Sequence, residues 1–102
     1  DKDIQAVLIC ASTDMHSPLS IEAIQAGKHV FCEKPIDHDV NKIKEVLDVV
    51  NASGLKYQVG FNRRFDHNFR AIKEAVASGK IGKQQIIKSN ISWPRSSTYW
   101  IR

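Results

Sequence analysis

The sequence lacks the features that define several protein classes. Two cysteines in 102 residues are too few for a disulfide scaffold. The longest uninterrupted apolar run covers residues 6–11, far short of the roughly 20 residues that cross a bilayer. Charged residues precede that run at positions 1–3, and no secretory signal is recognisable there. We therefore expect a cytoplasmic protein without a membrane span.

The two cysteines, Cys10 and Cys32, each lie in a short apolar run of the kind that forms a strand. Such positions favour buried, free thiols in a reducing compartment over a disulfide. A metal site would need two further ligands at a suitable spacing, and the sequence offers none. We therefore predict no metal.

The net charge of +4 does not indicate nucleic-acid binding, because the basic residues are dispersed. Lys42 and Lys44, for example, alternate with Glu45 and Asp48, which is typical of a solvated helix face. The sequence shows no row of basic residues of the kind that binds a phosphate backbone.

Strands alternate with helices along most of the chain. The apolar run at 6–11 predicts a central strand covered on both faces. Ser17 and Pro18 are suited to the N-cap and the first turn of a helix. The expected elements are strands over 6–11, 29–32 and 56–61, and helices over 17–27, 39–54 and from 66 or 68 to 79. This order predicts an α/β fold with right-handed crossovers and a parallel sheet.

Residues 85–93 follow a different pattern. Ile87, Ile91 and Trp93 recur at even spacing with polar residues between them, which favours a half-exposed antiparallel strand. We therefore predict a change of sheet between Gly79 and Gly82, with one domain over 1–80 and the start of another over 81–102.

Three loops after the predicted strands hold most of the polar candidates: residues 12–16, 33–35 and 62–64. Ligands of open parallel sheets bind outside the carboxyl ends of the strands, so these loops are expected to line one crevice. Ser12 and Thr13 can offer hydroxyls to a ribose or a phosphate, and His16 can reach over the ligand. Alternatively, the hydroxyls cap a turn and His16 is a surface histidine.

Lys34 is the sharpest candidate, because it stands between an apolar strand and Pro35. An ammonium there can polarise a carbonyl or hold a hydroxyl oxygen. The alternative is a salt bridge to Glu33 or a solvated loop lysine. Of Arg63 and Arg64, one is expected to pack on neighbouring phenylalanines while the other binds an anion or a polyol hydroxyl.

Other chemistry has little support. Asp37 and Asp39 flank a helix start, where caps and dipole partners explain them better than a catalytic carboxylate pair. No serine lies in a G-x-S-x-G elbow, and no G-x-G-x-x-G turn occurs to hold a pyrophosphate. The chain also starts abruptly on a strand and stops with the predicted antiparallel segment barely begun, so we expect it to continue into a longer protein at both ends.

Residues 21–35, ending A-G-K-H-V-F-C-E-K-P, and residues 60–66, G-F-N-R-R-F-D, resemble the Gfo/Idh/MocA family of NAD(P)-dependent oxidoreductases. The likeness is greatest to members that oxidise inositol. It implies the second half of a Rossmann-type parallel sheet, followed by the first strand of an antiparallel α+β substrate domain. Such enzymes often form homo-oligomers through that antiparallel sheet.

The resemblance also implies an activity, hydride transfer between NAD or NADP, with NAD favoured, and a hydroxyl carbon of a polyol or sugar. Lys34 matches the lysine that contacts both the nicotinamide ribose and the substrate, and Arg64 matches an arginine near the polyol. The matching cofactor contacts are Ser12, Thr13, His16, Glu33 and Lys34.

The catalytic base of the family has no counterpart in these residues, so we expect the chain alone to be inactive. An NAD-requiring glycoside hydrolase and a non-catalytic cofactor-sensing module remain as alternatives. Because the strand over 6–11 would lack a neighbour on one side, we also expect the isolated chain to associate through that edge or through residues 85–93, or to be only partly ordered.

Overall fold

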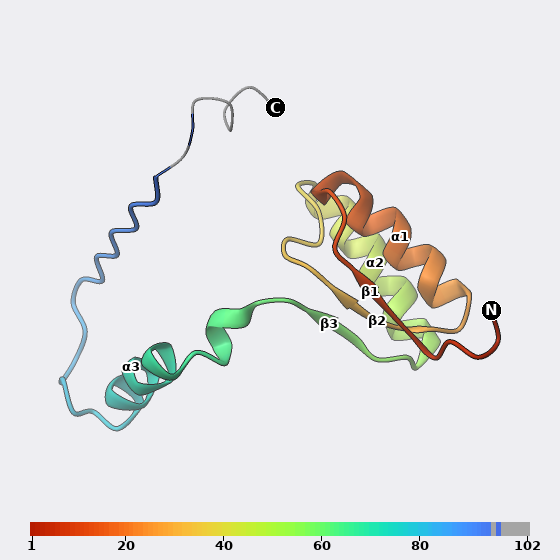
Figure 1. The fold of residues 1–102 in the computed structure, drawn as a ribbon. Helices are drawn as coiled ribbons and strands as arrows, with labels where there is room; N and C mark the ends of the chain where they lie inside the picture. Colours follow the sequence, from red (N-terminus) through yellow and green to blue (C-terminus); the bar gives the residue numbers. More distant parts are fainter. Residues whose placement is uncertain (95, 97–102) are drawn as a thin grey trace. The chain divides into compact units, whose positions relative to one another are not determined.

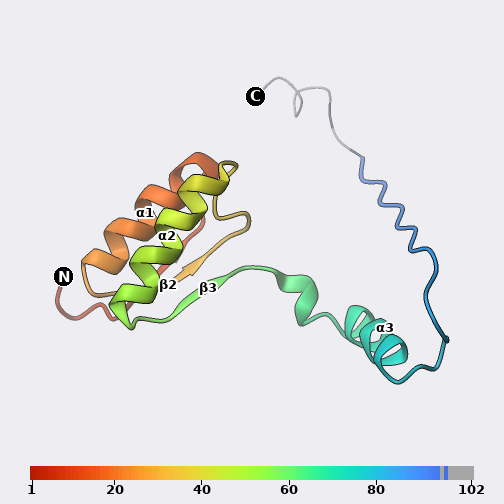
Figure 2. The same ribbon diagram turned by 180° about the vertical axis from the view of Figure 1, so that it is seen from behind.

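The computed structural model describes residues 1–94 and residue 96. The chain forms two compact units, Asp1–Asp66 and His67–Arg102 (Figure 1). In the first unit, three parallel strands lie in the order β1 (Ala6–Ile9), β2 (His29–Cys32) and β3 (Tyr57–Val59). Two helices, α1 (Thr13–Gln25) and α2 (Val40–Ser53), pack together on one face of this sheet (Figure 2). The predicted α/β fold with a parallel sheet is confirmed.

The strand bounds follow from the register of the sheet. β2 covers the predicted residues, whereas β1 ends at Ile9 instead of residue 11. Ile9 is paired with Cys32, the last residue of β2, so the ladder has no partner for the next residues of β1. Cys10 is exposed, so the prediction that both thiols are buried is wrong for Cys10 and right for Cys32. Both cysteines are free, as predicted.

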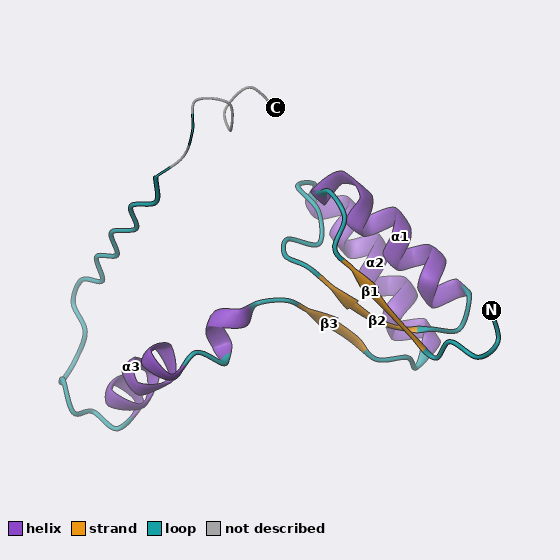
Figure 3. Cartoon of the chain, viewed as in Figure 1, coloured by secondary structure: helices purple, strands orange, loops and turns teal. Residues whose placement is uncertain are grey.

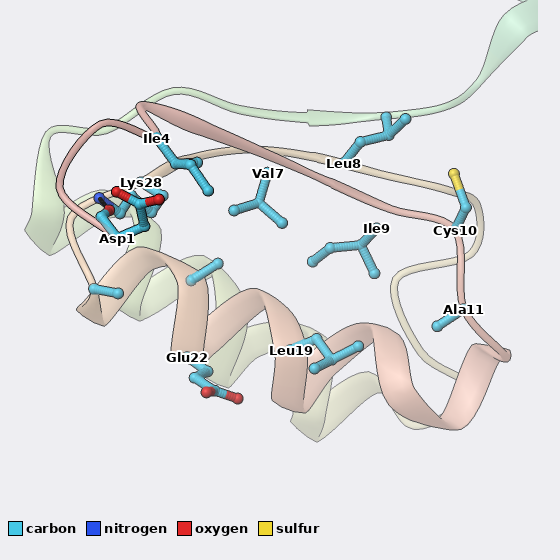
Figure 4. A pocket seen from close by; sticks show the side chains of 12 residues that line it. Asp1, Ile4, Val7, Leu8, Ile9, Cys10, Ala11, Leu19, Glu22 and Lys28 are labelled. Atoms are coloured by element: carbon cyan, nitrogen blue, oxygen red, sulfur yellow. Dashed lines mark hydrogen bonds between the residues drawn. The ribbon is translucent and has the colours of Figure 1, made fainter.

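The prediction that β1 is covered on both faces is wrong within the described residues, whereas its edge position agrees with the expected lack of a neighbour on one side. β1 lies at the edge of the sheet, and its side chains alternate between two environments. Ile9 points toward α1 and is 4% exposed, whereas Leu8 points away and is 66% exposed (Figure 4). A groove of about 620 Å³ runs between β1 and α1, lined mostly by apolar side chains that include Val7 and Leu19.

α1 begins four residues earlier than the predicted start at Ser17. Ser12 is the N-cap, and Pro18 lies inside the helix, where it cannot donate a backbone hydrogen bond. His16 and Ser17 are buried against the segment that follows β2. These tertiary contacts, which no local pattern reveals, explain why the helix extends past the proline signal.

α2 agrees with its prediction at both ends. Asp39 is the N-cap, and its carboxylate accepts a hydrogen bond from the backbone N–H of Asn41 at 2.8 Å. Gly54 ends the helix in the left-handed conformation, with φ of 67°. Val46 is fully buried on the apolar face of the helix.

The core of the first unit joins β1, β2 and α1. Its buried members are Ile9, Ala23, Ile24, Val30 and Cys32. A polar pair stands beside them: the hydroxyl groups of buried Ser20 and half-buried Tyr57 are 3.0 Å apart. This core fixes α1 on the sheet and so fixes the loops at the strand ends.

The second unit contains α3 (His67–Ala77), coloured as a helix in Figure 3. Its predicted apolar stripe of Phe69, Ile72 and Val76 is present and exposed within this unit. Residues 85–93 carry no regular secondary structure, so the antiparallel strand and the boundary between residues 80 and 81 stay predictions. Across residues 1–94 and 96, no helix is both long enough and apolar enough to cross a bilayer.

Candidate active site

The carboxyl ends of the three strands are tied into one edge by backbone hydrogen bonds. The N–H of Glu33 donates to the carbonyl of Ile9 at 2.9 Å, which joins the ends of β2 and β1. The N–H of Gly60 donates to the carbonyl of Cys32 at 2.8 Å, which joins the ends of β3 and β2. The loops that hold the predicted site residues therefore start side by side at this edge, as the strand pattern predicts.

Ser12 and Thr13 lie at the N-terminus of α1, directly after the loop that follows β1. The Ser12 hydroxyl does not cap a backbone N–H of the helix. Instead, its hydrogen bond to Asp14 is the main cause that holds the pKa of that carboxyl below its usual value. The turn-capping alternative for Ser12 therefore does not describe its side chain, and Thr13 is half-buried beside it.

His16 lies in the interior, with only 2% of its surface exposed, so it is not the surface histidine of the alternative interpretation. Its Nδ1 is 2.6 Å from the carbonyl oxygen of Pro35, and its Nε2 is 3.0 Å from that of Ala11. The ring thus joins the loop after β1 to the loop after β2. A cofactor contact through a ring nitrogen would compete with one of these carbonyls, and it stays a prediction.

Ser17 and Asp37 form a second tie between the same segments. The Ser17 hydroxyl is 2.7 Å from Asp37 Oδ2 and 3.2 Å from the carbonyl oxygen of Ile36. Asp37 Oδ1 accepts a hydrogen bond from the backbone N–H of Asp39 at 3.0 Å. That N–H, and then the Ser17 hydroxyl, lower the pKa of Asp37. Asp37 is thus a structural acceptor, as predicted, whereas the pairing with Ser17 was missed because the two are twenty residues apart.

Glu33 and Lys34 follow β2 directly. Glu33 Oε2 accepts a hydrogen bond from the backbone N–H of Lys34 at 3.2 Å. Lys34 is exposed, and the described residues provide no ion pair between its ammonium and Glu33. The peptide bond between Lys34 and Pro35 is cis. Because no ion pair joins Lys34 to Glu33 among the described residues, the salt-bridge alternative is not observed. The exposed Lys34 side chain is open to a ligand.

Arg64 belongs to a short 3₁₀ helix, η1 (Asn62–Arg64), which follows β3 at this edge. Phe61 and Phe65 flank η1 and are 54% and 69% exposed. The expected packing of one arginine on these rings therefore does not bury them. Arg64 is itself exposed and can meet a polar ligand.

An open parallel α/β sheet binds its ligands outside the carboxyl ends of the strands, which is where these polar loops lie. The chain belongs to the Gfo/Idh/MocA oxidoreductase family with an NAD-binding Rossmann fold, whose model matches residues 1–61.

Two inositol dehydrogenases are similar to this chain over most of its length. Inositol 2-dehydrogenase of Rhizobium meliloti is 46% identical over 85 residues, which are 83% of this chain and 26% of that protein. Myo-inositol 2-dehydrogenase of Thermotoga maritima is 42% identical over 88 residues, 86% of this chain and 26% of that protein. The chain thus spans about a quarter of the length of the relatives it matches.

Solved structures agree with these relatives. Scyllo-inositol dehydrogenase from Lactobacillus casei, with bound NAD(H) and scyllo-inositol, matches with a TM-score of 0.75 and 44% identity. The match covers 78% of this chain and 24% of that one. Myo-inositol 2-dehydrogenase from Lactobacillus plantarum matches with a TM-score of 0.76 and 40% identity, over 79% and 24% of the two chains. The resemblance stated from the sequence is confirmed.

Proposed function

We propose that this chain is part of an NAD-dependent dehydrogenase that oxidises a hydroxyl carbon of inositol or a related polyol. The observation that carries the proposal is the exposed Lys34 at the carboxyl edge of the sheet, in a loop fixed from both neighbouring strands. The similarity to an enzyme that binds NAD(H) and scyllo-inositol supports the cofactor and the substrate class.

The residues at the edge fit a dinucleotide. Ser12 and Thr13 lie at the N-terminus of α1, where backbone N–H groups favour an anionic oxygen. Glu33, the neighbour of Lys34, packs against Gly60 at the end of β3. NAD, when bound, supplies the hydride acceptor. The glycine-rich pyrophosphate turn is not among these 102 residues.

Lys34 has the central role in the proposed reaction. Its ammonium has three donors and no acceptor, so it can hold the hydroxyl oxygen of the substrate and favour loss of the hydroxyl proton. Arg64 is proposed to bind another hydroxyl of the polyol. The group that finally accepts the proton is proposed to lie outside this chain, because no residue at the edge matches the base of the family.

The proposal also covers the localisation, the oligomeric state and the partners of the enzyme. We propose a cytoplasmic homo-oligomer that assembles through an antiparallel sheet, with small molecules rather than nucleic acids or membranes as partners. The dispersed basic charge supports the exclusion of nucleic acid. Equilibrium sedimentation of the full-length protein measures the oligomeric state directly.

The test of the function compares the full-length protein with its Lys34→Ala variant. The wild type is expected to reduce NAD with myo-inositol or scyllo-inositol, and the variant is expected to lose about 10²-fold or more in kcat. Lys34→Arg should also fail, because a planar guanidinium does not replace a compact ammonium. Lys44→Ala, on the exposed side of α2, is the matched control. A Lys34→Ala enzyme with wild-type kcat would overturn the assignment.

A further inference from the structure

We propose that His16 is a positioning residue that sets the place of Lys34 by holding the carbonyl group of Pro35. The inference rests on the proposed function, because it concerns the same lysine. It differs from a cofactor contact in naming a backbone oxygen of the protein, and not the ligand, as the partner of the ring.

The geometry of the ring carries the proposal. His16 comes from the first turns of α1, and its Nδ1 is 2.6 Å from the oxygen of the residue that directly follows Lys34. Its Nε2 faces the oxygen of Ala11, in the loop that leads to Ser12 and Thr13. One buried ring therefore spans the loop that holds Lys34 and the loop that holds the proposed cofactor hydroxyls.

Both partners of the ring are backbone carbonyls, which accept hydrogen bonds and cannot donate them. A nitrogen of His16 satisfies either oxygen only when that nitrogen carries a hydrogen. The side chain is almost fully buried, so water does not substitute readily for a lost contact. A neutral ring carries one N–H and donates to one carbonyl only, and the proposal assigns that hydrogen to Nδ1, whose contact with Pro35 is the shorter of the two. Amide side chains that keep either nitrogen position therefore test the two loops separately.

Ser17 strengthens the same connection one residue further along the chain. Its hydroxyl is within hydrogen-bond distance of Ile36 and Asp37, so α1 holds three consecutive residues after Lys34. α1 itself is anchored on the sheet by Ala23 and Ile24, which belong to the core. The core thus holds α1 in place, and α1 in turn holds the loop that follows Lys34.

The expected effect is larger on turnover than on binding. A reacting group displaced by about 1 Å can cost roughly 10²-fold in rate, whereas the ground-state affinity for a cofactor that makes many contacts changes less. Loss of the contact to Pro35 should therefore lower kcat while the dissociation constant for NAD stays nearly constant. A merely structural role would instead lower the melting temperature without this split.

Two variants separate the two contacts of the ring. The amide nitrogen of Asn lies near the place of Nδ1, and that of Gln lies near the place of Nε2. His16→Asn keeps a donor for Pro35 and should retain kcat within about threefold, whereas His16→Gln loses that donor and should fall at least roughly tenfold. The measurements are kcat, the dissociation constant for NAD and the melting temperature of the full-length enzyme.

The outcomes distinguish this inference from the function on which it rests. Equal kcat losses in His16→Asn and His16→Gln, or wild-type kcat in His16→Gln, would overturn it. If either His16 variant fails to fold, Ser17→Ala removes the adjacent contacts, and it must lower kcat without weakening NAD binding for the inference to stand. Activity in Lys34→Ala would instead overturn the proposed function.

Discussion

The carboxylate of Glu33 lies directly against Gly60. A Cβ atom at position 60 would be 3.2 Å from Cδ and Oε1 of Glu33 and 3.3 Å from Oε2. Gly60 is buried at the end of β3, and its N–H is hydrogen bonded to Cys32. Glycine permits this close approach, and the side chain that approaches belongs to the loop of Lys34.

We predict that Gly60→Ala shifts Glu33 with little loss of stability. The new methyl group meets the far end of a flexible side chain, which can move by a few tenths of an ångström. The moved carboxylate also loses its hydrogen bond to the backbone N–H of Lys34. We therefore expect weaker NAD binding and a lower kcat in the full-length protein, measured by titration and by steady-state kinetics.

Gly54→Ala is the matched control for this prediction. Nothing lies within 4 Å of a Cβ at position 54, but its φ of +67° belongs to the left-handed region. A side chain there costs about 1–2 kcal/mol of folding stability, with no reason for an effect on NAD. If Gly60→Ala instead loses more stability than Gly54→Ala and binds NAD normally, the proposed role of the close approach is wrong.

The pKa of Asp37 predicts an acid-sensitive contribution to stability. The N–H of Asp39 and the hydroxyl of Ser17 lower this pKa in the folded state, so the unfolded chain binds a proton more readily. The stabilisation is therefore present above the ordinary pKa of 3.8 and is lost as the pH falls through the lower folded value. Urea unfolding between pH 2 and pH 7 should show a flatter decline in Asp37→Asn than in the wild type. Parallel curves would contradict this prediction.

The raised pKa of Tyr57 predicts a loss of folding stability at alkaline pH. Burial is the main cause that raises its pKa to about 12, and the hydrogen bond between Tyr57 and Ser20 opposes the shift. The stabilisation is complete below the ordinary value of 10.0 and is lost as the pH rises toward 12. A tyrosinate absorbance titration of the wild type, with that of Tyr57→Phe subtracted, should give a midpoint near 12. A midpoint at the ordinary value would refute the burial argument.

The bounds of β2 and both ends of α2 could be predicted from the sequence, because interactions between residues close in the chain set them. The cap at Asp39, the left-handed Gly54 and the apolar residues of β2 each act within a few residues. The start of α1 could not be predicted in this way. Ser17 and Pro18 carry a strong signal for a helix start, yet contacts to residues 35–37 outweigh it.

The residues of the candidate site likewise fall into those that local patterns predicted and those that only tertiary contacts reveal. The strand ends and the family resemblance placed Lys34 and Glu33 at the carboxyl edge, and the structure agrees. The roles of Gly60 and Ser17 had no sequence signal, because each depends on a partner about twenty residues or more away. Buried contacts between loops are set by the tertiary fold, so a single sequence does not reveal them.

The last prediction concerns the exposed side of β1. Leu8 and the groove between β1 and α1 present apolar surface beside an edge strand whose outer backbone groups have no neighbouring strand in the described sheet. An exposed apolar edge of this kind recruits further strands. We therefore predict that the 102-residue chain on its own self-associates, and that Leu8→Lys shifts it toward a monomer in sedimentation velocity.

Charged residues, lysine above all, are the usual protection of natural edge strands, which is the reason for choosing this substitution. Ile87→Lys, outside the sheet of the first unit, serves as the control and also tests association through residues 85–93. A larger effect of Ile87→Lys than of Leu8→Lys would assign the association to that segment. A wild-type chain that sediments as a monomer and unfolds in one cooperative transition would show that the edge of β1 needs no partner.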